Sequence, residues 1–86
     1  MARYRLLIKP SAVKEIEAVP LIKERRRIIE RISKLAENPR PFGCEKLSGQ
    51  EKYRLRQGRY RILYSISDQD LVVNVVKVGH RKDVYN

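Results

Sequence analysis

An 86-residue chain has room for one folded domain, and we expect a single domain over residues 1–86. Twenty Lys and Arg against ten Asp and Glu give a net charge of +10, which favours a polyanionic partner such as nucleic acid. The single cysteine, Cys44, excludes an internal disulfide and indicates a reducing compartment, and no apolar run approaches the ~20 residues of a membrane span. We therefore expect a cytoplasmic protein without a membrane partner.

The N-terminal half of the chain predicts one strand followed by two helices. Residues 2–9 alternate apolar and basic side chains, which is typical of a half-buried strand. Pro10-Ser11 ends this strand, and Ser11 is the expected N-cap of a short helix that continues to Val19. In residues 20–38, apolar side chains recur at helical spacing, which predicts an amphipathic helix of about five turns. Its apolar stripe comprises Leu21, Ile28, Ile32 and Leu35, with Ile22, Ile29 and Ala36 beside it.

The C-terminal half predicts a loop and then three strands. Residues 39–50 are rich in Pro and Gly, and two alternating strands follow, joined through Gln57-Gly58. The last strand, near residues 71–78, is apolar on both faces, as expected of a central strand covered on one side. We expect an α+β fold: an N-terminal strand, a helical hairpin, then a three-strand antiparallel meander, with the helices packed on one face of a four-stranded sheet.

Half of the net charge lies in residues 39–67, which carry seven basic and two acidic side chains. Strand alternation places Arg54, Arg56, Arg59 and Arg61 on the open face of the sheet, away from the helices. No Asp or Glu occurs between Lys52 and Ser67, so the mutual repulsion of these arginines is an avoidable cost. Planar guanidinium groups bind phosphate in a bidentate manner, which favours an anion site over an ordinary solvated face. The expected RNA- or phosphate-binding residues are Arg54, Arg56, Arg59, Lys52 and Lys46.

The last strand is expected to lead, through a change of direction at Gly79, to His80, Arg81 and Tyr85 at one end of the arginine face. The chain has no metal-ligand set and no Gly-rich phosphate loop, so we expect no cofactor and no metal. These residues suit metal-free RNA cleavage, in which the ribose 2′-OH attacks its own phosphate. Arg61 and Arg81 would stabilise the developing charge, and His80 and Tyr85 would transfer protons. The products would be a 2′,3′-cyclic phosphate and a 5′-hydroxyl, and DNA, which lacks the 2′-OH, would be inert.

Three stretches carry a family resemblance over essentially the whole chain: "KPSAVKEIEAVP", "EKLSGQEKYRLRQGRYRILYSI" and "VVKVGHRKDVYN". With these motifs the sequence resembles RelE-type toxins of bacterial and archaeal toxin–antitoxin pairs, within the RelE/ParE superfamily. The resemblance implies an mRNA interferase that cuts mRNA in the ribosomal A site. It also implies two partners, the ribosome with its mRNA and a cognate antitoxin with an acidic or amphipathic segment, and no DNA contact by the toxin alone.

The general base of such a reaction stays open among three residues. Some family members carry lysines at the positions of Arg54 and Arg56, some carry a lysine at His80, and others use a glutamate near the position of Glu45. We favour Tyr85 over Glu45, and His80 can serve as either acid or base.

Two alternatives compete with the interferase reading. One is a ParE-like toxin that inhibits gyrase by binding. The other is a non-catalytic basic module that binds RNA or an acidic partner.

Overall fold

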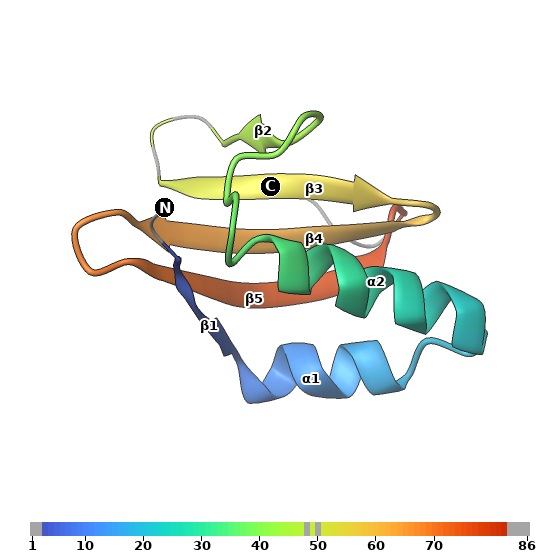
Figure 1. The fold of residues 1–86 in the computed structure, drawn as a ribbon. Coiled ribbons are helices and arrows are strands. Elements are labelled where there is room, and N and C mark those ends of the chain that lie inside the picture. The colour runs from blue at the N-terminus through green and yellow to red at the C-terminus, as the bar shows by residue number, and fades with distance from the viewer. Residues whose placement is uncertain (1–2, 48, 50, 83–86) are drawn as a thin grey trace.

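The computed structural model describes residues 3–47, 49 and 51–82. Two helices pack against one face of a mixed sheet, and the opposite face of the sheet is not covered by either helix (Figure 1). The elements in chain order are β1 Arg5–Ile8, α1 Pro10–Glu17, α2 Ile22–Lys34, β2 Glu45–Lys46, β3 Lys52–Gln57, β4 Tyr60–Ser67 and β5 Val72–His80. The predicted α+β class and helical hairpin on one face are therefore confirmed.

The sheet has five strands in the order β1-β5-β4-β3-β2. The meander β3-β4-β5 is antiparallel as expected, while β1 pairs in parallel with β5. The fifth strand is β2, a two-residue strand inside the segment predicted as loop. Two residues show no periodicity, so sequence pattern could not reveal this strand.

The core lies between the helices and the covered face of the sheet. Strand β4 alternates between buried and half-buried side chains along its whole length, as the predicted parity requires. The central position of β5 between β1 and β4 explains why its sequence is almost continuously apolar. The largest fully buried side chains are Tyr64, Ile28, Leu35, Leu55, Ile62, Val73, Val75 and Val78.

The helix termini differ from the prediction. Helix α1 begins with Pro10 as its first residue and Lys9 as its N-cap, so the expected N-cap role of Ser11 is wrong. Proline suits this position because its fixed φ is helical and the first turn needs no N–H donor. In α2, Ile22 and Ile29 are 58% and 46% exposed, so the core-facing stripe is narrower than the sequence indicated.

The edge of β5 is covered in two ways. Strand β1 pairs with its first half, and α1 covers the rest through Glu15, whose carboxylate accepts the Val78 N–H at 2.9 Å and Lys77 Nζ at 3.1 Å. The strand ladder has a bulge between Leu63 and Tyr64, close to this point. A side-chain acceptor therefore satisfies a backbone donor that an unpaired strand edge would otherwise expose.

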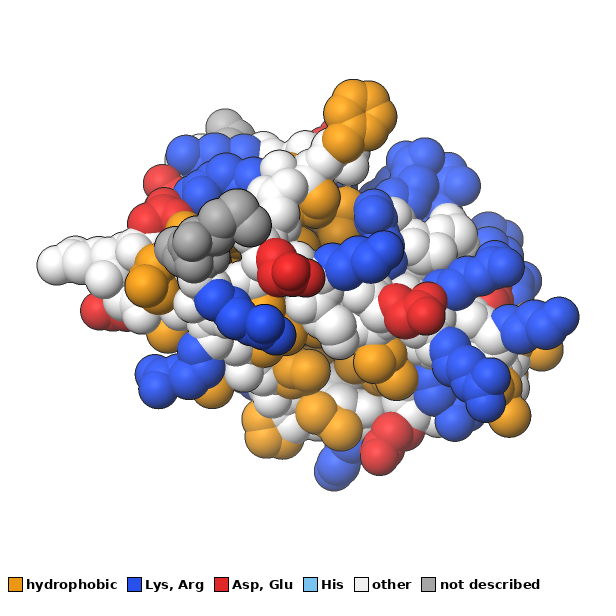
Figure 2. Space-filling model, viewed as in Figure 1, with side chains coloured by type: hydrophobic (Ala, Val, Ile, Leu, Met, Phe, Trp, Pro, Cys, Tyr) orange, Lys and Arg blue, Asp and Glu red, His pale blue; other side chains and the backbone are white. Residues whose placement is uncertain are grey.

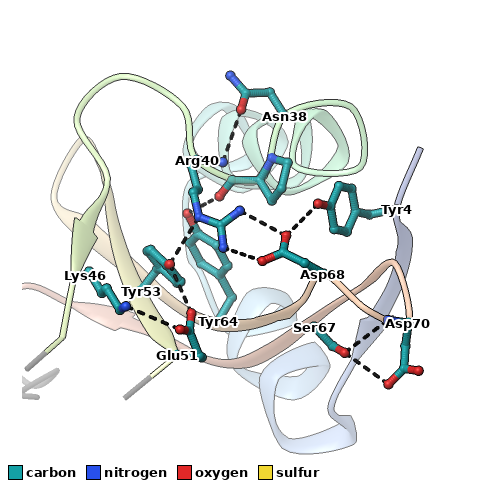
Figure 3. A network of polar contacts seen from close by, with 11 residues as sticks. Tyr4, Asn38, Arg40, Lys46, Glu51, Tyr53, Tyr64, Ser67, Asp68 and Asp70 are labelled. Atoms are coloured by element: carbon teal, nitrogen blue, oxygen red, sulfur yellow. Dashed lines mark hydrogen bonds and ion pairs between the residues drawn. The ribbon is translucent and has the colours of Figure 1, made fainter. Parts of the chain in front are cut away.

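A polar network ties the loop after α2 to the sheet at the opposite end of the molecule (Figure 3). Arg40 donates two hydrogen bonds to Asp68, at 3.0 and 2.8 Å, and a third to the Tyr53 hydroxyl at 3.1 Å. The Tyr4 hydroxyl donates to the same carboxylate at 2.6 Å. The Arg40 guanidinium, together with Tyr4, lowers the pKa of Asp68 to about 2. In this way β1, the loop and the β4–β5 turn are fixed to one another.

Within the part of the chain that the structure describes, no helix is both long enough and apolar enough to cross a bilayer.

Candidate anion-binding site at the hairpin end of the sheet

The open face of the sheet carries a row of basic side chains on β3 and β4. Arg56 and Arg61 lie directly opposite one another in the ladder, and Lys52 lies opposite Ser65. Arg56 forms no ion pair with any other described residue, so two cationic side chains face each other across adjacent strands. Like charges directly opposite in a sheet are unfavourable. The predicted arginine face is thus present at Arg56 and Arg61, with Lys52 on the same face.

An acidic side chain joins this face at the β2 edge. Glu45 pairs in register with Arg54, whose Nε and Nη2 donate to Glu45 Oε1 at 3.3 and 3.2 Å. The expectation that the arginines have no acidic partner is therefore wrong at Arg54. The stretch from Lys52 to Ser67 does lack acids, but the short strand that brings Glu45 alongside could not be predicted.

Arg59 is not on the open face. Strand β3 ends at Gln57 and β4 begins at Tyr60, so Gly58 and Arg59 form a two-residue turn rather than the predicted Gln57-Gly58 connection. Gly58 has a φ of +57°, which suits glycine at the first position of such a turn. Arg59 instead reaches α2 and donates to both carboxylate oxygens of Glu24, Nε at 3.0 Å and Nη2 at 2.9 Å. Counting strand parity through the turn placed this residue on the wrong face.

Lys46 also lies apart from the arginine face. It pairs in register with Tyr53, a residue of the covered face, and its Nζ donates to Glu51 Oε1 at 3.3 Å. The structure therefore separates Lys46 from the other predicted phosphate-binding residues.

A depression of about 290 Å³ opens at the end of β4 and β5, beside the hairpin turn. Among the residues that the structure describes, those that line it are all basic: Arg59, Arg61, His80, Arg81 and Lys82. Strand β5 continues through Gly79 to His80, so the expected change of direction at Gly79 does not occur. Gly79, which has no side chain, lies directly opposite Arg61 on the neighbouring strand. The structure thus brings three of the four predicted catalytic residues, Arg61, His80 and Arg81, to one hollow.

His80 is held by two contacts. Its ring packs edge-on against Tyr60, with centroids 5.7 Å apart, and its Nδ1 accepts the Lys82 N–H at 3.3 Å. With Nδ1 acting as an acceptor, the neutral ring carries its proton on Nε2. In this arrangement His80 is a hydrogen-bond donor through Nε2.

The backbone at the site is fixed by a further hydrogen bond. The Arg81 N–H donates to the Arg59 carbonyl at 2.8 Å, which extends the β4–β5 ladder one residue beyond His80. Tyr85, the fourth predicted catalytic residue, lies outside the described residues.

Basic side chains also gather on the helix face next to this site. Figure 2 shows Lys and Arg concentrated at the right of the view, where Figure 1 places the start of α2 and the β3–β4 turn. Such a cluster lowers the energy of a phosphate group and of charge that develops on it. The geometry therefore defines a small basic α+β protein with a candidate anion site at one end of its sheet.

Comparison with known proteins places this chain in a family. The family model for the ParE toxin of the type II toxin–antitoxin system parDE matches residues 6–85, and the chain belongs to this family. A putative RelE-like toxin protein of Escherichia coli is 30% identical over 89 residues, covering 98% of this chain and 92% of the relative. The protein is a type II toxin of the RelE/ParE superfamily.

Solved structures agree with this assignment. The archaeal RelE–RelB complex from Pyrococcus horikoshii matches with a TM-score of 0.80 and 29% identity, covering 98% of this chain and 100% of that one. The isolated E. coli RelE toxin matches with a TM-score of 0.76 and 28% identity, over 90% of this chain and 83% of that one. The expected family and fold are confirmed.

Proposed function

We propose that this toxin is a ribosome-dependent mRNA interferase that cleaves mRNA by attack of a ribose 2′-OH on the adjacent phosphate. The observation that carries the proposal is a hollow whose described lining residues are all basic, with Arg61, His80 and Arg81 on its walls. A gyrase inhibitor that acts by binding has no evident need for a histidine among arginines at an anion site.

Each side chain has a role in the proposed reaction. Arg61 and Arg81 bind the scissile phosphate and stabilise the charge that develops on its oxygens, while Arg56 and Lys52 bind flanking phosphates. His80 in its imidazolium form donates the Nε2 proton to the leaving 5′-oxygen; in that form Nδ1 carries a proton and gives up the hydrogen bond that it accepts from the Lys82 N–H in the neutral ring. We assign removal of the 2′-OH proton to Tyr85; the competing base Glu45 is engaged at Oε1 by two hydrogen bonds from Arg54, at 3.3 and 3.2 Å.

Cleavage of ribosome-bound mRNA tests this proposal. The purified toxin is added to ribosomes programmed with a defined mRNA, alongside the same mRNA with 2′-deoxyribose at the cleaved nucleotide. We expect cleavage of the first and none at the substituted position of the second. Tyr85→Phe and Arg81→Ala should each reduce the rate while thermal unfolding stays unchanged. Cleavage at the 2′-deoxy position would refute the mechanism, and full activity in both variants would remove these residues from it.

A second candidate is inhibition of DNA gyrase, which the match to the ParE toxin family model favours. A supercoiling assay separates the two functions. Inhibition of gyrase by a preparation that leaves ribosome-bound mRNA intact would establish this alternative, whereas mRNA cleavage without an effect on supercoiling would exclude it. RNA binding without either activity would instead indicate a non-catalytic module.

The proposed partners of the chain are a cognate antitoxin and the ribosome, which place its action in the cytoplasm. Support for the antitoxin comes from the matched RelE structures of P. horikoshii and E. coli that were solved as complexes with RelB. Exposed apolar side chains at the N-cap of α2 and on the helix, Leu21, Ile22 and Ile29, offer an amphipathic segment a surface to pack against. Co-expression with the cognate antitoxin should yield a stable complex that no longer cleaves mRNA.

A further inference from the structure

Glu24, an acidic residue at the start of α2, lies next to the site although no catalytic role requires it. Both of its carboxylate oxygens accept hydrogen bonds from Arg59, at 2.9 and 3.0 Å, across 35 residues of sequence. Its side chain is 21% exposed, against 58% for that of Arg59. The hydrogen-bonded Arg59 guanidinium holds the pKa of the Glu24 carboxyl below its usual range. This two-bond pair ties the β3–β4 turn to the helix layer.

The turn held in this way also holds the backbone of Arg81, the residue that follows β5. Arg59 accepts the Arg81 N–H through its backbone carbonyl at 2.8 Å, the contact that places Arg81 at the wall of the hollow. The turn itself contains Gly58, whose backbone is intrinsically permissive. A side-chain anchor on Arg59 therefore restricts the carbonyl on which the position of Arg81 depends.

We infer that Glu24 is a positioning residue: through Arg59 it fixes the backbone of Arg81, and so orients the Arg81 guanidinium toward the anion site. Its catalytic consequence rests on the proposed mRNA cleavage, but the coupling itself does not. Arg59 then links α2 to the backbone of Arg81. It does not serve as the phosphate ligand that its sequence position suggested.

The sign of the effect separates positioning from simple electrostatics. Removing the Glu24 carboxylate makes the net charge at the rim of a basic site more positive by one unit. General electrostatics then predicts that the affinity for RNA is equal or higher. A positioning role predicts that kcat falls while KM is unchanged or lower, since a misplaced charge-stabilising group acts in the transition state. If Arg59 were a phosphate ligand restrained by Glu24, its release would raise activity.

The test uses Glu24→Ala, with Glu30→Ala as a matched control that removes an exposed acid from the same helix. Amide hydrogen exchange of Arg81, referenced to Ile62 in β4, reports the coupling directly. We expect exchange at Arg81 to accelerate about fivefold to tenfold in Glu24→Ala and to stay at the wild-type rate in Glu30→Ala. In the cleavage assay, kcat should fall about tenfold or more for Glu24→Ala alone.

A charge-reversal cycle distinguishes loss of the Glu24–Arg59 pair from a local effect of the Glu24 substitution on α2. Glu24→Arg and Arg59→Glu should each accelerate Arg81 exchange, and the double variant should restore it because the pair re-forms with opposite polarity. Unchanged Arg81 exchange in Glu24→Ala overturns the inference, as does an unchanged or increased kcat with accelerated exchange. If the wild type cleaves no RNA, the proposed function fails, and the exchange data alone decide whether Glu24 positions Arg81.

Discussion

The direct opposition of Arg56 and Arg61 on β3 and β4 predicts a stability gain when one of the two charges is removed. Directly opposite residues have Cβ atoms ~5 Å apart. With guanidinium centres about 7 Å apart in water, Coulomb's law gives a repulsion of about 0.6 kcal/mol. Arg56→Gln should therefore raise the melting temperature by about 2–5 °C in a domain of this size. An amino-acid change that stabilises the fold while weakening RNA binding is the expected mark of a functional arginine.

Thermal unfolding at two salt concentrations measures this effect. The gain should be present at about 0.01 M salt and small at about 1 M, where the Debye length falls to ~3 Å. Arg5→Gln is the matched control, because it removes the same charge from β1 at a position opposite Val72. On single-stranded RNA, Arg56→Gln should reduce the salt dependence of binding by about 0.7 in log–log slope, and Arg5→Gln should leave it unchanged. An equal stability gain in both variants, or none in Arg56→Gln, would show that repulsion between Arg56 and Arg61 does not destabilise the fold.

Three further predictions test separate parts of the molecule. Arg61→Ala should lower the rate of mRNA cleavage about 10²–10³-fold, the usual effect of removing one fixed charge-stabilising group; a rate within threefold or so of wild type would exclude that role. Tyr64→Phe removes the buried hydrogen bond from the Tyr64 hydroxyl to the Pro39 carbonyl, 2.8 Å long, and should cost about 1–2 kcal/mol in urea unfolding; a cost near zero would contradict the contact. Because Arg40 lowers the pKa of Asp68 to about 2, their pairing stabilises the fold above pH ~4 and is lost as the pH falls toward 2. Asp68→Asn should show a weaker loss of stability over that window, measured by melting temperature against pH, and a slope identical to the wild type would count against the pairing.

The sequence predicted what depends on local periodicity. Alternation along residues 60–67 set the buried face of β4, and the continuous apolar run of β5 indicated its central place in the sheet. The α+β fold followed from the order of these elements. Each of these features is encoded within a window of ten residues or so, where strand or helix period dominates.

The site was only partly predictable because its charge pairs join distant segments. Arg54 meets Glu45 through a strand too short to leave a pattern, and Arg59 meets Glu24 because a two-residue turn points it at the helix. A correct turn assignment would have removed Arg59 from the open face, because Arg59 then belongs to the turn between Gln57 and Tyr60, where strand alternation does not apply. The clustering of Arg61, His80 and Arg81 was predicted because all three lie at the paired ends of adjacent strands.

Two long-range contacts, at the edge of β5 and in the loop after α2, restrict the position of the sheet that carries the basic site. Glu15 closes the edge of β5 near the bulge, and Arg40 ties the loop after α2 to the β4–β5 turn. Both contacts join segments more than 25 residues apart. The basic site therefore lies on a sheet in which the edge of β5 and the β4–β5 turn are both tied to other elements.

End-group analysis of mRNA cut in the ribosome tests most directly the proposal that the toxin cleaves mRNA by attack of a ribose 2′-OH. Fragments produced by the purified toxin are assayed for the chemistry of their new termini. Attack by the 2′-OH predicts a 2′,3′-cyclic phosphate, or its hydrolysed phosphate, on the upstream fragment and a 5′-hydroxyl on the downstream fragment. Fragments with a 3′-hydroxyl and a 5′-phosphate would contradict attack by the 2′-OH. Intact mRNA together with inhibited gyrase would contradict the proposed mRNA cleavage itself.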